Sequence, residues 1–135
     1  MNLSLVDAFA RFGAKPRNRL RALSAIASDG AMVLNCSHAY FGHPSQGVLR
    51  YEDKLSRDTA PTKETGLLGE HLALARDSEL PVRMIVTPTV EEKSRKGGFH
   101  VRFDLIGKVV KFDGDHFIID FTREGAVLAA PKRSK

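Results

Sequence analysis

Apolar and polar residues alternate along much of this chain, and the alternation predicts a protein rich in β-strands. The clearest case is residues 99–105, where four apolar side chains fall on one face: Phe99, Val101, Phe103 and Leu105. A period of two places such side chains on the buried side of a half-exposed strand. Similar alternation predicts strands at residues 48–55, 82–86, 108–112 and 116–121.

Helical spacing of apolar residues predicts two helices, at residues 4–12 and 65–78. The first has Ser4 as a candidate N-cap and Gly13 just past its end. The second carries Leu68, Leu72 and Ala75 on one stripe. Both helices are therefore expected to pack an apolar face against the strands.

A long β-hairpin is predicted from residues 18–27 and 31–41. The dipeptide Asp29-Gly30 between them is typical of a two-residue type I′ turn, in which both central residues have positive φ. With Ser28 opposite Ala31, the register would place Arg21 across from His38 and Arg19 across from Tyr40. These side chains would share one face at the open end of the hairpin.

The predicted elements follow the order αβββαββββ, which indicates an α+β fold. We expect a mainly antiparallel, strongly bent or barrel-like sheet of six to seven strands with two helices, because closure removes exposed edges. A chain of 135 residues fits a single domain, expected to cover residues 1–130, followed by a basic tail at residues 131–135.

Charge and composition indicate which kind of partner and which cellular compartment to expect for the protein. The net charge of +5 favours a polyanionic partner, either nucleic acid or an acidic protein surface. The single cysteine, Cys36, suits a reducing compartment, and no apolar run is long enough for a membrane span. We therefore expect a cytoplasmic protein without a membrane segment. No cofactor is implied, and no metal site is predicted because paired zinc-ligand spacing is missing.

The open end of the hairpin is the main candidate site. Arginines would hold phosphates, and an aromatic ring would stack on a base. The candidate nucleic-acid-binding residues are Arg17, Arg19, Arg21, His38, Tyr40, Lys93, Arg95 and Lys96. The leading interpretation is a small non-catalytic nucleic-acid-binding module. An accessory or inhibitor subunit that docks on an acidic protein is the alternative from another class.

A second alternative is a metal-dependent nuclease. Glu52 and Lys54 lie two apart on a predicted strand, within the order helix, three strands, helix, strand. This arrangement resembles the core of restriction-endonuclease-like nucleases, in which an upstream Asp and the Glu bind a metal and the Lys supports attack by water. The upstream carboxylate here would be Asp29, which the predicted pairing places roughly 20 Å from Glu52.

The pair Arg17 and Arg21, followed by Asn35 and Ser37, is similar to the motif with which PilZ proteins bind a cyclic dinucleotide. That motif requires glycine at the position where this chain has Tyr40, and a bulky side chain does not fit a backbone that needs glycine. The chain is therefore not assigned to that family, although the comparison points to the same arginines.

Overall fold

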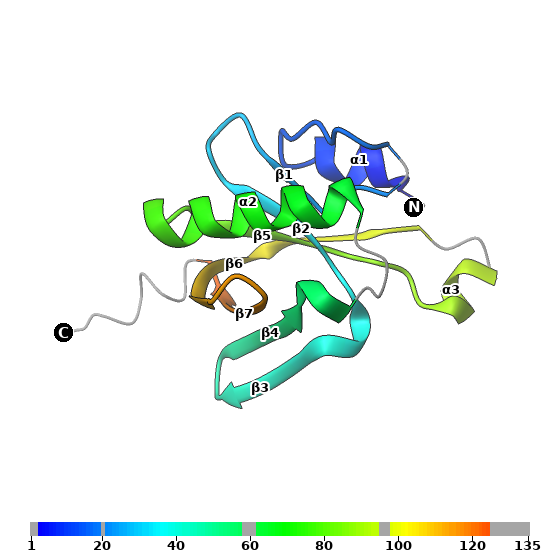
Figure 1. Ribbon diagram of the computed structural model, residues 1–135. Coiled ribbons are helices and arrows are strands. Elements are labelled where there is room, and N and C mark those ends of the chain that lie inside the picture. The colour runs from blue at the N-terminus through cyan, green and yellow to red at the C-terminus, as the bar shows by residue number, and fades with distance from the viewer. Residues whose placement is uncertain (1–2, 20, 58–61, 95–97, 125–135) are drawn as a thin grey trace.

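The computed structural model describes residues 3–19, 21–57, 62–94 and 98–124. Within them the chain forms three α-helices and one sheet of seven strands (Figure 1). The elements in chain order are α1 (Leu5–Ala10), β1 (Ser24–Ile26), β2 (Met32–Cys36), η1 (His38–Tyr40), β3 (Phe41–Ser45), β4 (Val48–Lys54), η2 (Leu55–Arg57), α2 (Lys63–Ser78), β5 (Val82–Val86), α3 (Val90–Ser94), β6 (His100–Phe112) and β7 (His116–Arg123). The predicted tail at residues 131–135 lies outside the described residues.

The strand order in the sheet is β1-β2-β5-β6-β7-β4-β3. Only β2 and β5 are parallel, and every other neighbouring pair is antiparallel. The expectation of an α+β fold with a mainly antiparallel sheet of six to seven strands is confirmed, with seven strands in the described structure. The barrel-like closure is wrong, because β1 and β3 are opposite edges of an open sheet.

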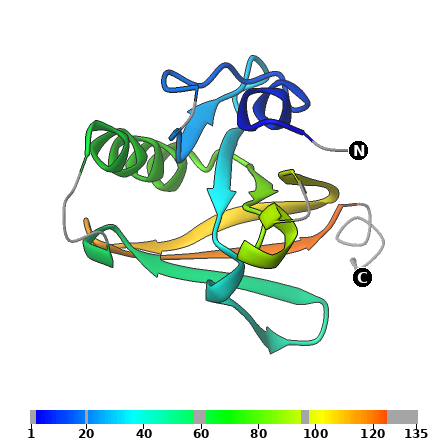
Figure 2. The ribbon, with the colours of Figure 1, turned by 90° about the vertical axis from the view of Figure 1, so that its right-hand side faces the viewer.

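Helices cover both sides of β2, as Figure 2 shows. Met32 and Leu34 belong to the core that contains Leu72 of α2. Val33, which points to the other face, belongs to a second core together with Phe9 of α1. Because both faces are covered, consecutive residues of β2 are buried, and this strand lacks the alternation of a half-exposed one.

The first hairpin is present but shorter than predicted, and its register differs by one residue. Ser24 lies opposite Leu34, where Ala25 was expected. The slip arises because the loop has three residues, with Ala27 N donating to Ala31 O at 2.8 Å, and Gly30 takes the positive φ of 91°. A shift of one residue reverses the face to which every side chain points.

Two further differences change the predicted element order. The segment expected to be a loop after the hairpin contains β3, so four strands precede α2 instead of three. The strands predicted at residues 99–105 and 108–112 form one strand, β6, of 13 residues. An irregularity between Val109 and Lys111 leaves Val110 46% exposed and buries Val109 instead.

The longest helix, α2, begins two residues earlier than predicted. Thr62 is its N-cap, and a capping box with Thr65 pairs two backbone N–H groups with side-chain oxygens. The helix ends at Glu79, which adopts the left-handed conformation. The five-residue α3 is a third helix, in a segment where no helix was predicted. Within the described residues, no helix is both long enough and apolar enough to cross a membrane.

Candidate functional site

The arginines predicted to lie on a strand are instead on a loop that precedes β1. This loop is held at its base by a bridge between Ala14 and Ala27, and at its far end by Ala22, which is fully buried. Inside the loop, Asn18 Oδ1 accepts a hydrogen bond from Arg21 N at 3.0 Å. An Asn side chain that bonds the backbone ahead of it favours a turn over a strand.

This loop and the amino end of α2 line one hollow of about 860 Å³, which we call the arginine hollow. The described residues that line it come from these two segments: Arg17, Asn18, Arg19, Arg21, Thr62, Lys63 and Glu64. The three arginines and Lys63 are exposed. The hollow therefore gathers four cationic side chains and one acidic side chain.

The arginines of the hollow differ from five others in the protein because they have no anionic partner among the described residues. Five arginines each bind a carboxylate: Arg50 with Asp120, Arg57 with Asp53, Arg76 with Asp77, Arg83 with Glu124 and Arg102 with Asp104. In the part of the chain that the structure describes, the guanidinium groups of Arg17, Arg19 and Arg21 make neither a hydrogen bond nor an ion pair. Their charges are available to a ligand.

The amino end of α2 adds to the positive potential of the hollow. The backbone N–H groups of Lys63 and Glu64 precede the regular hydrogen-bond ladder of the helix. The dipole of a 16-residue helix places partial positive charge at this end. Helix amino ends of this kind favour phosphate and other anions.

Glu64 is a member of the hollow that sequence reasoning missed. Its side chain is only 7% exposed, and its Oε1 is buried with no hydrogen-bond partner among the described residues. The sequence offers one signal, an acidic residue at the start of a predicted helix, but acidic residues are common there. Its burial could not be predicted from the sequence.

The structure separates Tyr40 from the arginines with which it was grouped. Tyr40 belongs to η1 and lies in a different hollow, of about 310 Å³, which we call the Tyr40 hollow. The other residues that line it are Glu52, Asp53, Lys54, Arg57 and His116. The Arg57 guanidinium lies 4.7 Å from the centroid of the Tyr40 ring. The ring is 36% exposed, so part of it remains accessible.

Glu52 and Lys54, the residues of the nuclease alternative, are both exposed in the Tyr40 hollow. His116 Nε2 donates to Glu52 Oε2 at 2.6 Å, and His116 is also the cross-strand neighbour of Lys54. Asp53 points to the opposite, buried side of β4, where it accepts from Arg57 Nε at 2.9 Å. Within the described ranges, no group of three or more His, Cys, Asp or Glu side chains could hold a metal ion.

The remaining predicted residues do not join either hollow. His38 lines a third hollow, together with Glu91, Glu92 and His100. Lys93 is exposed on α3. The positions of Arg95 and Lys96 lie outside the described residues. The predicted patch is thus divided, because Arg19 and Arg21 do not pair with the segment that contains His38 and Tyr40.

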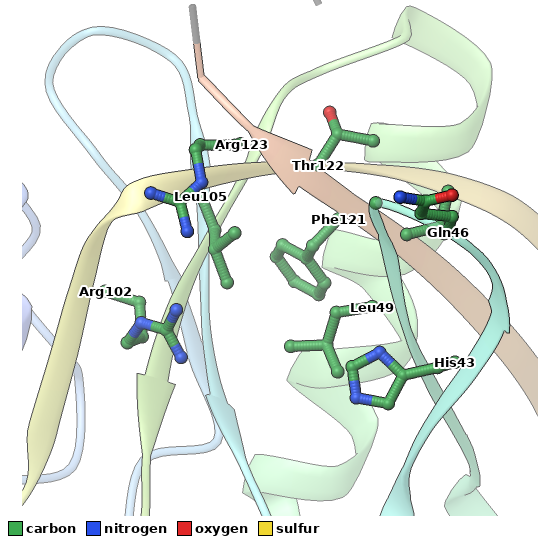
Figure 3. Close-up of a pocket in the computed structure, with 10 residues that line it drawn as sticks. His43, Gln46, Leu49, Arg102, Leu105, Phe121, Thr122 and Arg123 are labelled. Carbon is green, nitrogen blue, oxygen red and sulfur yellow. The ribbon is translucent and has the colours of Figure 1, made fainter. Parts of the chain in front are cut away.

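A fourth hollow, of about 640 Å³, lies between the β3–β4 hairpin and the facing parts of β6 and β7 (Figure 3). Leu49, Leu105 and Phe121 form its apolar centre. Arg102 and Arg123 stand on one side of this centre, and His43 and Gln46 stand on the other. Phe121 is fully buried and Leu105 is 7% exposed, whereas Val48 and Leu49 are half-buried.

Comparisons with known proteins give no match: no family model, no curated protein and no solved structure is similar to this chain. The candidate site is therefore argued from the geometry and charges of the chain itself.

Proposed function

We propose that this protein is a nucleic-acid-binding module of the cytoplasm and that the arginine hollow holds the phosphate backbone. The observation that carries the proposal is the contrast between two sets of arginines. Five bind carboxylates of the protein, whereas Arg17, Arg19 and Arg21 are exposed and unpaired in the described structure beside the amino end of α2. Arginine and helix amino ends are the usual donors to phosphate oxygens.

The physical driving force would be the release of counterions. Each cation placed against a phosphate frees condensed counterions, so affinity falls as salt rises. Arg17, Arg19, Arg21 and Lys63 could each contribute one such contact, since all four line the same hollow. Binding through this site is expected to depend on backbone charge more than on base sequence.

A salt titration of a fluorescently labelled single strand, followed by anisotropy, tests the proposal. The wild type should bind at low salt, and the Arg19→Ala, Arg21→Ala double variant should bind more weakly at every salt concentration. The slope of log affinity against log salt should fall by about 1.4, because each lost contact with a single strand removes about 0.7.

The matched control is the Lys108→Ala, Lys111→Ala double variant. It removes the same charge from exposed positions of β6 outside the arginine hollow. Equal losses in the two double variants would show that only net charge matters and would contradict the proposed site. Wild-type protein that binds no strand at low salt would contradict the function itself.

Docking on an acidic protein is the competing outcome for the same unpaired arginines. Affinity purification from the native host, with and without nuclease treatment, separates the two. Loss of the partner after nuclease treatment supports the proposed function. A stoichiometric protein complex that survives the treatment supports the alternative.

Cleavage of nucleic acid at the Tyr40 hollow is a second candidate function. The observation that favours it is the 2.6 Å hydrogen bond between Glu52 and His116, beside Lys54. A carboxylate and an imidazole within hydrogen-bond distance can exchange protons with a bound ligand, and a lysine can stabilise phosphate charge.

Incubation of labelled DNA and RNA strands with the protein, with and without divalent metal ions, tests this candidate. Cleavage by the wild type that is lost in Glu52→Gln and retained in Glu70→Gln would support it. Glu70 is an exposed glutamate on α2, outside the Tyr40 hollow. No cleavage of either strand under any condition would exclude it.

A further inference from the structure

Among the described residues that line the arginine hollow, Glu64 is the one whose charge opposes phosphate binding. It lines the same hollow as the three arginines and is 7% exposed. A first-turn Glu is favoured by the helix dipole, but an exposed carboxylate would gain that stabilisation equally well. The dipole therefore accounts for the residue type and not for its burial.

The burial leaves a strong hydrogen-bond acceptor unused. Oε1 of Glu64 has no partner among the described residues. A buried polar atom without a partner is unfavourable by about 1–3 kcal/mol, and more for a charged group. Such an atom is normally matched by a donor, and a ligand in this hollow could supply one if the Glu64 side chain turned its almost inaccessible Oε1 outward.

A ligand that fits must combine an anionic group with N–H donors. The anion would meet Arg17, Arg19 and Arg21, and the N–H donors would meet Glu64. A nucleotide has both parts, and a hollow of about 860 Å³ is large enough for one. In single strands the Watson–Crick edge of the base is free for such contacts.

Among the bases, guanine matches a carboxylate best. Its N1–H and N2–H donors lie side by side and can bind the two carboxylate oxygens together. Adenine and cytosine present one donor next to an acceptor. Uracil presents one donor between two carbonyl oxygens, which a carboxylate would repel.

We propose that Glu64 selects guanine in a single strand whose phosphates are held by the arginines of the same hollow. This inference rests on the proposed function, since the strand must first bind. It adds a specificity-determining residue to an otherwise sequence-independent site.

The test uses short labelled oligouridine strands that differ only at one central position, with guanine, inosine, adenine or uridine there. The wild type should bind the guanine strand about tenfold more tightly than the uridine strand, because one bidentate base contact supplies discrimination of this order. The inosine strand, which lacks the 2-amino donor, should lie between them.

Glu64→Gln should abolish the preference for guanine. Because it removes a negative charge from the hollow, it should not lower the affinity for the uridine strand. Glu70→Gln, with the same charge change at an exposed position of α2, should keep the preference. The thermal unfolding of both variants shows whether they are folded, and the inosine comparison tests the idea in the wild type alone.

Two results would overturn the inference. The first is equal, salt-dependent affinity of the wild type for all four strands, which would leave the proposed function intact. The second is a guanine preference that a folded Glu64→Gln variant keeps, which would show that the carboxylate does not contact the base. Absence of all binding at low salt would instead contradict the proposed function.

Discussion

Ser24 Oγ and His71 Nδ1 are joined by a hydrogen bond of 2.7 Å. Ser24 opens β1, directly after the loop that carries the arginines, and His71 lies on α2. Their bond therefore connects the two segments that form the arginine hollow. The relative position of the arginines and of Glu64 depends on this contact between helix and sheet.

We expect Ser24→Ala to lower the free energy of unfolding by about 1 kcal/mol, because Ser24 is buried and one hydrogen bond contributes about that much. Urea denaturation measures the change. Ser45→Ala, at an exposed position of β3, is the control and should leave the midpoint unchanged. Equal midpoints for both variants would show that the bond between β1 and α2 contributes nothing.

Protonation of His71 should lower the stability of the folded protein in mild acid. Burial lowers the pKa of His71 below its ordinary value of 6.5, although Glu70 and Glu64 act in the opposite direction. The unfolded chain then takes up the proton first, so this stabilisation is complete above pH 6.5 and is lost as the pH falls through the lowered pKa. In His71→Gln, the loss of stability between about pH 7 and pH 5 should be smaller than in the wild type. Identical pH profiles in urea denaturation would contradict this role.

Gly107→Ala should destabilise the protein by about 1–3 kcal/mol, as overpacking of a core does. A Cβ at Gly107 would lie 2.6 Å from two ring atoms of Phe121, which is fully buried and cannot move aside easily. Gly42→Ala is the matched control, since a Cβ there meets no atom within 4 Å. Thermal unfolding should show a large decrease for the first variant only, and similar melting temperatures would contradict the packing argument.

Asp53→Ala should lower the free energy of unfolding by about 2 kcal/mol, the contribution of hydrogen bonds to a charged group. Asp53 is 7% exposed and accepts hydrogen bonds from Arg57 Nε and from the Tyr51 hydroxyl. Asp77→Ala removes an exposed ion pair with Arg76 and should have little effect, because exposed pairs contribute little. Chemical denaturation compares the two, and equal effects would mean that burial of Asp53 adds nothing.

Turn residues and apolar spacing were enough to locate many elements from the sequence. The predicted helix at residues 65–78 differs from α2 only in its first two residues, because its Leu68, Leu72 and Ala75 stripe is a local signal. The strand predicted at residues 48–55 corresponds to β4 for the same reason. The hairpin around Gly30 was expected from its turn residues, and this glycine has positive φ.

Local patterns could not predict which strands pair with each other or in which register they pair. The parallel pairing of β2 with β5 joins strands that are separated by β3, β4 and α2 in the sequence. It depends on which apolar faces can be covered together, and no local pattern encodes that choice. The one-residue slip of the first hairpin arose from a loop of three residues where two were predicted. The expected pairing of Arg19 with Tyr40 is absent because β1 begins only at Ser24 and Tyr40 belongs to η1.

By itself the sequence determined the types and approximate limits of most elements, the excess of positive charge and the group of alternating arginines. Only the tertiary structure decided that these arginines lie on a loop beside the amino end of α2, without an ion pair to any described residue, in a hollow that also contains the buried Glu64. The physical reason is that periodicity and turn preference act over a few residues. Burial and charge pairing are settled between segments that meet only when the whole chain has folded.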